Sequence, residues 1–277
     1  MSDILNQIAL DHEVRYGTVI KIIKNSLNNQ HTTGVPKTNL NKILTALGDF
    51  QQYQKDIVKY EQIINTKPEI YTESRPKANR QFDQFFATEK SVFDKISLIS
   101  QSGDFYNRSV CILGDDDLLS LAIATLNQAK KITVFEIDPQ ICDYIKSQNQ
   151  DIEVISFDLK NKIPQNLKNQ FDLIITDPPY TAAGIKLFLN RGIELLKPLL
   201  TSRIYLSCGT SDRARERELA FQQIIWQMGL LINSKYFQFN QYIGADSIGN
   251  RSSLYVLDRT PKTKTIKIDS NPIYTNQ

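Results

Sequence analysis

The strongest constraint on the fold of this chain is a repeated alternation of short apolar runs and helical stretches between residues 108 and 258. Val, Ile and Leu dominate the apolar runs, as they do in strands that are buried on both faces. Strands joined by helices form a parallel sheet that carries helices on both sides. We therefore expect an α/β fold with a Rossmann-like, doubly wound sheet. The expected parallel strands are 109–113, 132–136, 152–157, 171–176 and 204–207.

The end of this region differs from its beginning. Two further apolar runs, 231–239 and 253–257, have no long helix between them. Strands joined by a short connection pair in antiparallel fashion, so we expect an antiparallel pair at one edge of the sheet. The last segment, 259–277, is polar, and we expect a flexible tail there.

The N-terminal part of the chain has a different pattern. Val19, Ile23 and Leu27 are spaced as on one face of a helix. Short helices of this kind predict a helical N-terminal module at 1–70, which a connector at 71–107 joins to the sheet. DNA-binding winged helices are modules of similar size. This module, however, has eight Lys or Arg residues and seven Asp or Glu residues, so it has no basic face. Packing against the larger domain and self-association into a homodimer are the roles that we expect.

Acidic residues follow four of the expected strands where those strands end. The carboxyl ends of parallel strands meet at one edge of a sheet, and ligands bind there in such folds. Helix capping would explain one or two of these acids, but the turns hold no Lys or Arg to neutralise them. The residues are Gly114 with Asp115, Asp116 and Asp117, then Glu136 and Asp138, then Asp158, and finally Asp177 with Pro178, Pro179 and Tyr180.

The turn after the first strand indicates the charge of the ligand. A dinucleotide site needs a glycine-rich turn that admits a pyrophosphate. This turn has one glycine, Gly114, and three aspartates that would repel phosphate. NAD, FAD and ATP are therefore disfavoured, and a sulfonium or an amine is favoured. Glu136 lies about 20 residues after Gly114, where nucleoside-binding α/β folds hold ribose hydroxyls, and Asp138 is the second choice. Asp158 suits either an adenine amino group or helix capping.

Other residue types limit the chemistry. The chain has two histidines near its N-terminus and three cysteines that lie far apart. We therefore expect no metal site and no histidine base, so acid–base catalysis depends on carboxylates. No apolar run is long enough to span a membrane, and residues 1–10 do not resemble a secretory signal. We expect a cytoplasmic protein with buried thiols and no membrane association.

Three segments of the chain together carry a family resemblance. They are Gly114-Asp-Asp-Asp-Leu-Leu-Ser-Leu-Ala, Asp177-Pro-Pro-Tyr, and an upstream set of Arg75-Pro, Phe82-Asp-Gln and Thr88-Glu. Together they resemble the branched-chain polyamine synthases, the N4-bis(aminopropyl)spermidine synthases, over residues 70–258. The resemblance implies a winged-helix-like N-terminal domain and a methyltransferase-type α/β domain. It also implies transfer of an aminopropyl group from decarboxylated S-adenosylmethionine to an internal amine of a polyamine such as spermidine, which releases methylthioadenosine. The donor is then a co-substrate, and no tightly bound cofactor is expected.

The resemblance also implies a role for each candidate residue. Asp116 matches the catalytic aspartate, and Asp177 would orient the reacting amine. Asp115 and Asp117 would line the polyamine site, with capping of the next helix as the alternative for Asp117. Asp83 would complete that site or form a salt bridge within the connector. Tyr180 would stack on the adenosine or the alkyl chain. The donor would be held by Gly114, Glu136, Asp138, Asp158, Pro178 and Pro179.

Two other functions stay open. One is an S-adenosylmethionine-dependent N-methyltransferase that acts on a nucleic-acid base, because Asp177-Pro-Pro-Tyr can present an amine to a methyl group. That function would require a glycine-rich first turn and a basic approach surface, which the sequence lacks. The other is a non-enzymatic regulator that senses polyamines and reads DNA through residues 1–70. The net charge of +3 is too small to indicate nucleic acid, and we expect no specific nucleic-acid partner.

Overall fold

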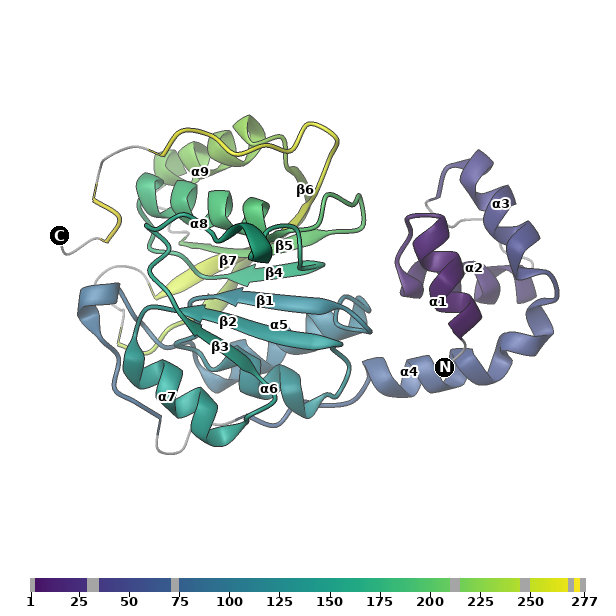
Figure 1. Ribbon diagram of the computed structural model, residues 1–277, viewed down its shortest axis with the longest axis horizontal. Helices are drawn as coiled ribbons and strands as arrows, with labels where there is room; N and C mark the ends of the chain where they lie inside the picture. The colour runs from purple at the N-terminus through teal and green to yellow at the C-terminus, as the bar shows by residue number, and fades with distance from the viewer. Residues whose placement is uncertain are drawn as a thin grey trace.

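The computed structural model describes residues 3–28, 35–70, 75–209, 215–244, 250–268 and 272–274. No helix in these ranges combines the length and the apolar character that a membrane crossing requires. The described chain forms a helical module and an α/β domain, which α4 connects (Figure 1).

A seven-stranded sheet with the order β3-β2-β1-β4-β5-β7-β6 forms the centre of the α/β domain. The first five strands are parallel, and β7 lies antiparallel between β5 and β6. The predicted doubly wound sheet and its antiparallel edge are confirmed. The strands are β1 (Ser109–Leu113), β2 (Lys131–Glu136), β3 (Glu153–Ser156), β4 (Leu173–Thr176), β5 (Arg203–Gly209), β6 (Leu231–Gln241) and β7 (Arg251–Asp258).

Helices cover both faces of this sheet (Figure 1). Alternate residues of β1 explain the two layers: Cys111 and Leu113 join the core under α8 and α9, whereas Val110 and Ile112 join the core under α5, α6 and α7. The central strands β1, β4 and β5 are buried on both sides, so each contributes to both cores. The helices are α5 (Glu89–Gln101), α6 (Leu119–Thr125), α7 (Pro139–Gln148), α8 (Ala182–Leu195) and α9 (Arg215–Gln227).

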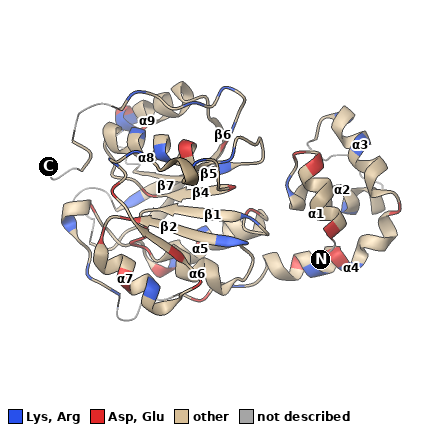
Figure 2. Ribbon diagram, viewed as in Figure 1, with Lys and Arg blue, Asp and Glu red and all other residues tan. Residues whose placement is uncertain are grey.

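The N-terminal module has a hydrophobic core of its own, which contains Val19 and Ile23 as the helical spacing predicts. Within 3–28 and 35–70 the chain forms helices only; residues 29–34 lie outside the described residues, so a winged-helix arrangement stays a prediction. Basic and acidic positions both occur along these helices (Figure 2). The elements are α1 (Asp3–Asp11), α2 (Tyr16–Leu27), α3 (Lys37–Leu47), a 3-10 turn (Phe50–Tyr53) and α4 (Gln54–Ile64).

The module meets the α/β domain at the edge where β1 and β5 begin. Asp104 is fully buried there and accepts hydrogen bonds from Arg203 (2.8 Å), Arg108 (3.3 Å) and the Tyr205 hydroxyl (2.7 Å). Arg15, directly before α2, adds ion pairs to Asp104 (3.4 Å) and Asp258 (3.1 Å). The acidic residues of the candidate site follow the opposite ends of the strands, so the described part of the module does not line that site.

The C-terminal segment differs from the expected flexible tail. The Lys264 amide donates to the Met228 carbonyl at the end of α9, and the Ile266 amide donates to Asn190 Oδ1 in α8. Ile273 and Tyr274 are 8% exposed and join the core beneath α8. The described residues of this segment are therefore packed on the domain, because the few apolar side chains among the polar ones are buried against its core.

Candidate active site

The candidate site lies at the carboxyl ends of β1, β2 and β4. The strand order reverses between β1 and β4, and α/β sheets bind their ligands at such a switch point. Gly114 ends β1 with a φ of +73°, a conformation that L side chains rarely adopt, and its amide donates to the Phe135 carbonyl (2.9 Å). The chain thereby turns toward the end of β2, and the three aspartates follow in this turn.

Asp115 is committed to the start of α6. Its carboxylate accepts from the amides of Leu119 (2.7 Å) and Ser120 (3.1 Å), and burial raises its pKa to about 8. Helix capping was expected at Asp117 as an alternative, and that expectation is wrong: Asp115 is the capping residue. Asp115 therefore supports the turn at the start of α6, and its substrate-binding role stays a prediction.

Glu136 holds the same turn from the end of β2. Its carboxylate accepts from the amides of Asp115 (2.8 Å), Ile137 (2.7 Å) and Asp138 (2.8 Å). The side chain is 4% exposed, and burial raises its pKa. Glu136 also lines the pocket described below, so this one carboxylate both holds the turn and forms part of the pocket wall.

Asp116 differs from its neighbours. It is partly exposed, and no part of the chain that the structure describes donates a hydrogen bond to its carboxylate. Burial raises the pKa of Asp116 well above its usual value, and the charges of Asp117, Glu136 and Asp177 raise it further. A carboxylate with high proton affinity and an unused face is suited to take a proton from an amine.

Asp117 lies on the connector side of the site. Its carboxylate accepts from the Ala87 amide (2.6 Å) and faces Lys95 Nζ of α5 at 4.0 Å. Burial raises its pKa, and Lys95 opposes that shift. Sequence reasoning missed Lys95 because it is remote from the strand ends, and its helical spacing alone gives no signal of a site.

Asp177 is held by two tyrosines. The hydroxyl of Tyr180 donates to Asp177 Oδ1 (2.8 Å), and that of Tyr242 donates to Oδ2. Ser252 lies 2.7 Å from the Tyr242 hydroxyl, so the β6–β7 pair is connected to the site. A Cβ at Gly209 would lie 2.4 Å from the Tyr180 ring, so glycine is required there for this arrangement. No pattern in the sequence indicates that Tyr242 belongs to the site.

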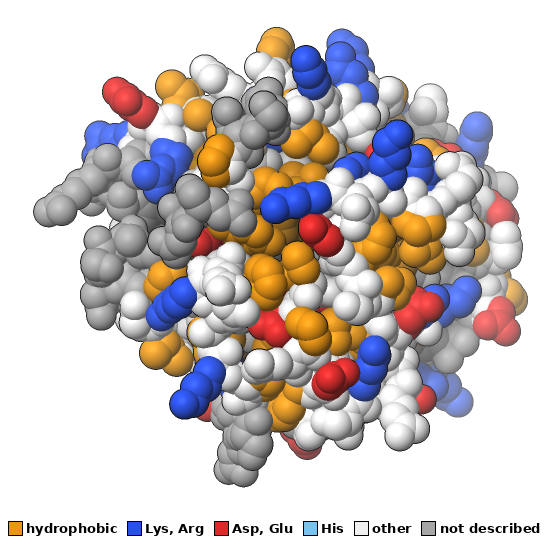
Figure 3. Space-filling model, turned by 60° about the vertical axis from the view of Figure 1, so that its left-hand side comes forward, with side chains coloured by type: hydrophobic (Ala, Val, Ile, Leu, Met, Phe, Trp, Pro, Cys, Tyr) orange, Lys and Arg blue, Asp and Glu red, His pale blue; other side chains and the backbone are white. Residues whose placement is uncertain are grey.

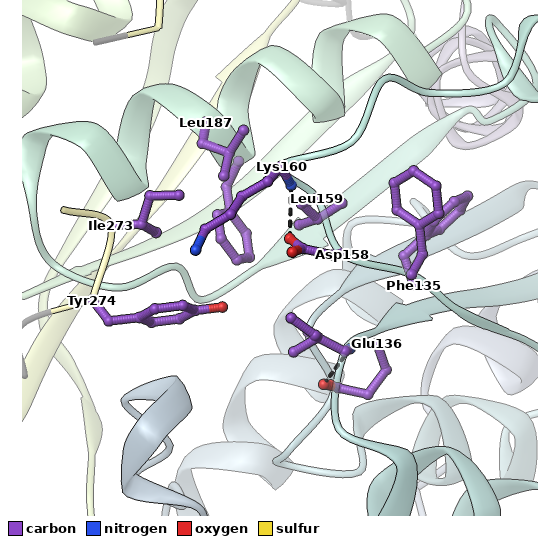
Figure 4. A pocket seen from close by; sticks show the side chains of 12 residues that line it. Phe135, Glu136, Asp158, Leu159, Lys160, Leu187, Ile273 and Tyr274 are labelled. Atoms are coloured by element: carbon purple, nitrogen blue, oxygen red, sulfur yellow. Dashed lines mark hydrogen bonds between the residues drawn. The ribbon is translucent and has the colours of Figure 1, made fainter. Parts of the chain in front are cut away.

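A pocket with about 320 Å³ of empty space, counted to its open mouth, adjoins these acids. Figure 4 shows Glu136 and Asp158 on one side of it and Tyr274 on the other. Burial raises the pKa of Tyr274 to about 12, and Asp158, Glu136 and Asp83 contribute to that shift. Apolar side chains gather near the centre of the face turned forward in Figure 3, with acidic and basic side chains beside them. The pocket is lined by Gly114, Phe135, Glu136, Ile137, Phe157, Asp158, Leu159, Lys160, Leu187, Phe188, Ile273 and Tyr274.

Three other expected residues, Asp138, Asp158 and Asp83, have different local environments. Asp138 caps α7 through the Gln140 amide (2.9 Å) and accepts from Gln84 Nε2 (3.1 Å), so its carboxylate is used structurally. Asp158 accepts from the Lys160 amide (2.8 Å) and caps no helix. Asp83 follows a 3-10 turn (Arg80–Phe82) with a φ of +55°.

Pro178 and Pro179 are buried between Asp177 and Tyr180, where they fix the turn rather than line the pocket. Among the residues described, no group of three His, Cys, Asp or Glu side chains is arranged to hold a metal ion.

Residues 49–274 match the family model described as the branched-chain polyamine synthase A C-terminal domain. An uncharacterised protein of Methanocaldococcus jannaschii is 37% identical over 221 residues, which is 78% of this chain and 55% of that protein. The N(4)-bis(aminopropyl)spermidine synthase of Thermococcus kodakarensis is 31% identical over 194 residues, 68% of this chain and 55% of that protein. The chain thus spans about half the length of the curated relatives it matches.

Solved structures agree on the fold. The branched-chain polyamine synthase of Thermus thermophilus, in complex with N4-aminopropylspermidine and 5'-methylthioadenosine, has a TM-score of 0.64 at 17% identity, with 98% of this chain and 97% of that chain covered. A candidate RNA methyltransferase of Pyrococcus horikoshii has a TM-score of 0.53 at 14% identity, with 74% and 98% covered. The expected methyltransferase-type α/β architecture is confirmed. The family match over most of the chain shows that this protein belongs to the branched-chain polyamine synthase family.

Proposed function

We propose that the protein is an aminopropyltransferase. Its donor is decarboxylated S-adenosylmethionine, its acceptor is an internal amine of a polyamine such as spermidine, and its by-product is methylthioadenosine. The family membership supports this reading, as do the relatives named N(4)-bis(aminopropyl)spermidine synthase.

The observation that carries the proposal is the position of Asp116. Its carboxylate faces the site without a hydrogen-bond donor from the described chain, beside Asp117, Glu136 and Asp177. Such a cluster attracts a sulfonium, an ammonium and a polyamine, and it repels the extra carboxylate of intact S-adenosylmethionine. The adjacent pocket, with aromatic Phe135 and Tyr274 and acidic Asp158, is suited to the nucleoside part of the donor.

The transfer then follows from these positions. The acceptor nitrogen attacks the propyl carbon that is bonded to sulfur. The new N–C bond forms as the C–S bond breaks. The electron pair of the C–S bond stays on sulfur, so methylthioadenosine leaves as a neutral thioether. The attacking amine gives up one proton, which Asp116 accepts. Asp177 orients the amine, since both tyrosine hydroxyls keep its carboxylate in one position.

The proposal is tested by incubating the protein with decarboxylated or intact S-adenosylmethionine and a panel of linear polyamines, followed by identification of products by mass. We expect an aminopropyl adduct and methylthioadenosine from the decarboxylated donor alone. Asp116→Asn serves as the inactive variant. Asp151→Asn, at an exposed position outside the candidate site, serves as the matched control. Methyl transfer from the intact donor would refute the proposal and favour the methyltransferase.

We further propose a cytoplasmic location and a homodimer. The free and buried thiols of Cys111, Cys142 and Cys208 support a reducing compartment. The outer edge of β6 is unpaired in the described sheet and carries exposed Leu231 and Phe237, which supports self-association. Light scattering of the purified protein measures its mass in solution, and a monomer at all concentrations would contradict the dimer.

A further inference from the structure

A buried lysine faces the acidic turn from a helix that no candidate residue occupies. Lys95 lies in the middle of α5 and is 1% exposed, and its Nζ is 4.0 Å from Asp117 Oδ2. A lysine is almost never fully buried unless it is paired. Among the described residues, Asp117 is the one carboxylate that forms an ion pair with Lys95.

Asp117 is arranged to be the charged partner in this contact. Its other oxygen, Oδ1, accepts from the Ala87 amide at 2.6 Å. Arg75, whose guanidinium stacks on Phe86 at 3.7 Å, adds a second positive charge on the same side. A backbone donor and two cations favour the ionised form of a buried carboxyl.

Asp116 shares the charge of Arg75 but has neither the backbone donor nor the ion pair with Lys95. No donor from the described chain reaches its carboxylate, and the strongest charge effect on it is the repulsion from Asp117. Two carboxyls whose charges interact strongly titrate as a pair. The group with fewer donors and cations takes up the first proton.

We propose that Lys95 is a positioning residue that keeps Asp117 as a carboxylate, so that Asp116 is the acid that takes up the proton of the acceptor amine. That the proton comes from an acceptor amine rests on the proposed function, whereas the order in which Asp116 and Asp117 bind protons does not. The role differs from a structural one because it acts on the protonation of Asp116 through Asp117.

Charged and titratable groups face Asp116 and Asp117 from several elements. Like charges come from the same turn, from the end of β2 and from the turn after β4, and the phenol of Tyr242 approaches from β6. The positive charges that act on Asp117 come from the connector and from α5. The groups are Asp115, Glu136, Asp177, Tyr242, Arg75 and Lys95.

The test measures the protonation of each acid directly. The full-length protein is labelled with 13C at the aspartate carboxyls, and Asp116→Asn and Asp117→Asn variants assign the two signals. Titration of the wild type is expected to show Asp116 binding its proton at higher pH than Asp117. The reverse order in the wild type overturns the proposal whether or not any Lys95 variant folds.

Lys95→Met then removes the charge and keeps the apolar stem. We expect the titration midpoint of Asp117 to rise by about one pH unit or more, the effect of losing an opposite charge at this distance. Lys95→Arg should restore the wild-type midpoint. Lys90→Met, on the same helix but with an exposed ammonium that pairs with Asp94, is the matched control. An unchanged Asp117 midpoint in folded Lys95→Met refutes the proposal.

Kinetics provide the second readout. As the Asp117 midpoint rises in Lys95→Met, a larger fraction of Asp117 is protonated at a given pH, so the strongest like charge beside Asp116 weakens and the proton affinity of Asp116 falls. The acidic limb of the kcat/KM profile should therefore move to lower pH, as it should in Asp117→Asn. Lys95→Met in the Asp117→Asn background should produce no further shift, and a further shift would contradict action through Asp117. If the wild type transfers no aminopropyl group while the carboxyl titrations hold, the proposed function fails and the role of Lys95 stands.

Discussion

Replacement of Asp104 by alanine should be among the most damaging single substitutions in the chain. Asp104 is fully buried and receives Arg203, Arg108 and the Tyr205 hydroxyl, and Arg15 pairs with it from the N-terminal module. Alanine removes the one carboxylate that faces three guanidinium groups at this edge of the described sheet. Asp258 still pairs with Arg203 and Arg15, so the compensation is partial.

The magnitude follows from burial. The side chains of Arg203 and Arg108 are 6% and 11% exposed, so water replaces little of the lost interaction. Removing one partner of a buried ion pair costs about 3–5 kcal/mol, because the other charge stays uncompensated. We expect the free energy of unfolding to fall by about that amount. The side chain of Arg15 is 23% exposed, so loss of its ion pair should contribute less to this fall than loss of the pairs with Arg203 and Arg108.

Urea unfolding monitored by circular dichroism measures this loss, with the exposed Asp151→Ala as the control. Burial alone raises the pKa of Asp104, but Arg15, Arg203 and Arg108 outweigh it and hold the pKa below 3.8. The contribution is therefore fully present above the ordinary aspartate pKa and is lost as pH falls through the lower, folded value. A loss below about 1 kcal/mol at neutral pH, typical of a surface pair, would refute the reasoning.

Four further predictions concern the site and the module. Asp116→Asn should lower kcat by about 10²–10⁴-fold, the usual effect of losing a general base, while calorimetric binding of methylthioadenosine stays unchanged. Glu136→Ala should weaken donor binding and also lower the free energy of unfolding by about 1–3 kcal/mol, since three backbone amides lose their acceptor; unaltered donor affinity would contradict its place in the pocket. Gly209→Ala should displace the Tyr180 ring and reduce turnover without unfolding the protein, as activity and thermal melts together would show. Duplex DNA should bind no tighter than about 10⁻⁴–10⁻⁶ M at physiological salt, and a sequence-selective footprint at nanomolar protein would contradict this.

The sheet and the acidic edge could be predicted because their signals are local. Apolar runs separated by helical stretches determine the strands, and the residue after each strand is placed by the topology alone. Gly114, Glu136, Asp158 and Asp177 are therefore where the sequence puts them. Capping was considered for Asp117 as an alternative, whereas Asp115 caps the helix, because the two residues lie two positions apart in one turn and only the backbone path decides between them.

The remaining site residues come from segments that are distant in sequence. Lys95 lies on α5, Tyr242 at the end of β6, and Tyr274 in the polar C-terminal segment. Each reaches the site through tertiary packing, which periodicity cannot reveal. The packed part of the C-terminal segment was missed for the same reason, since Ile273 and Tyr274 are two apolar residues in a polar context.

The most direct test of the central claim is the fragmentation spectrum of the product formed from decarboxylated S-adenosylmethionine and spermidine. The proposed function predicts aminopropyl transfer to the internal nitrogen, one methylthioadenosine released per transfer, and little product from Asp116→Asn. Transfer of a methyl group from intact S-adenosylmethionine, or undiminished turnover by Asp116→Asn, would contradict the account.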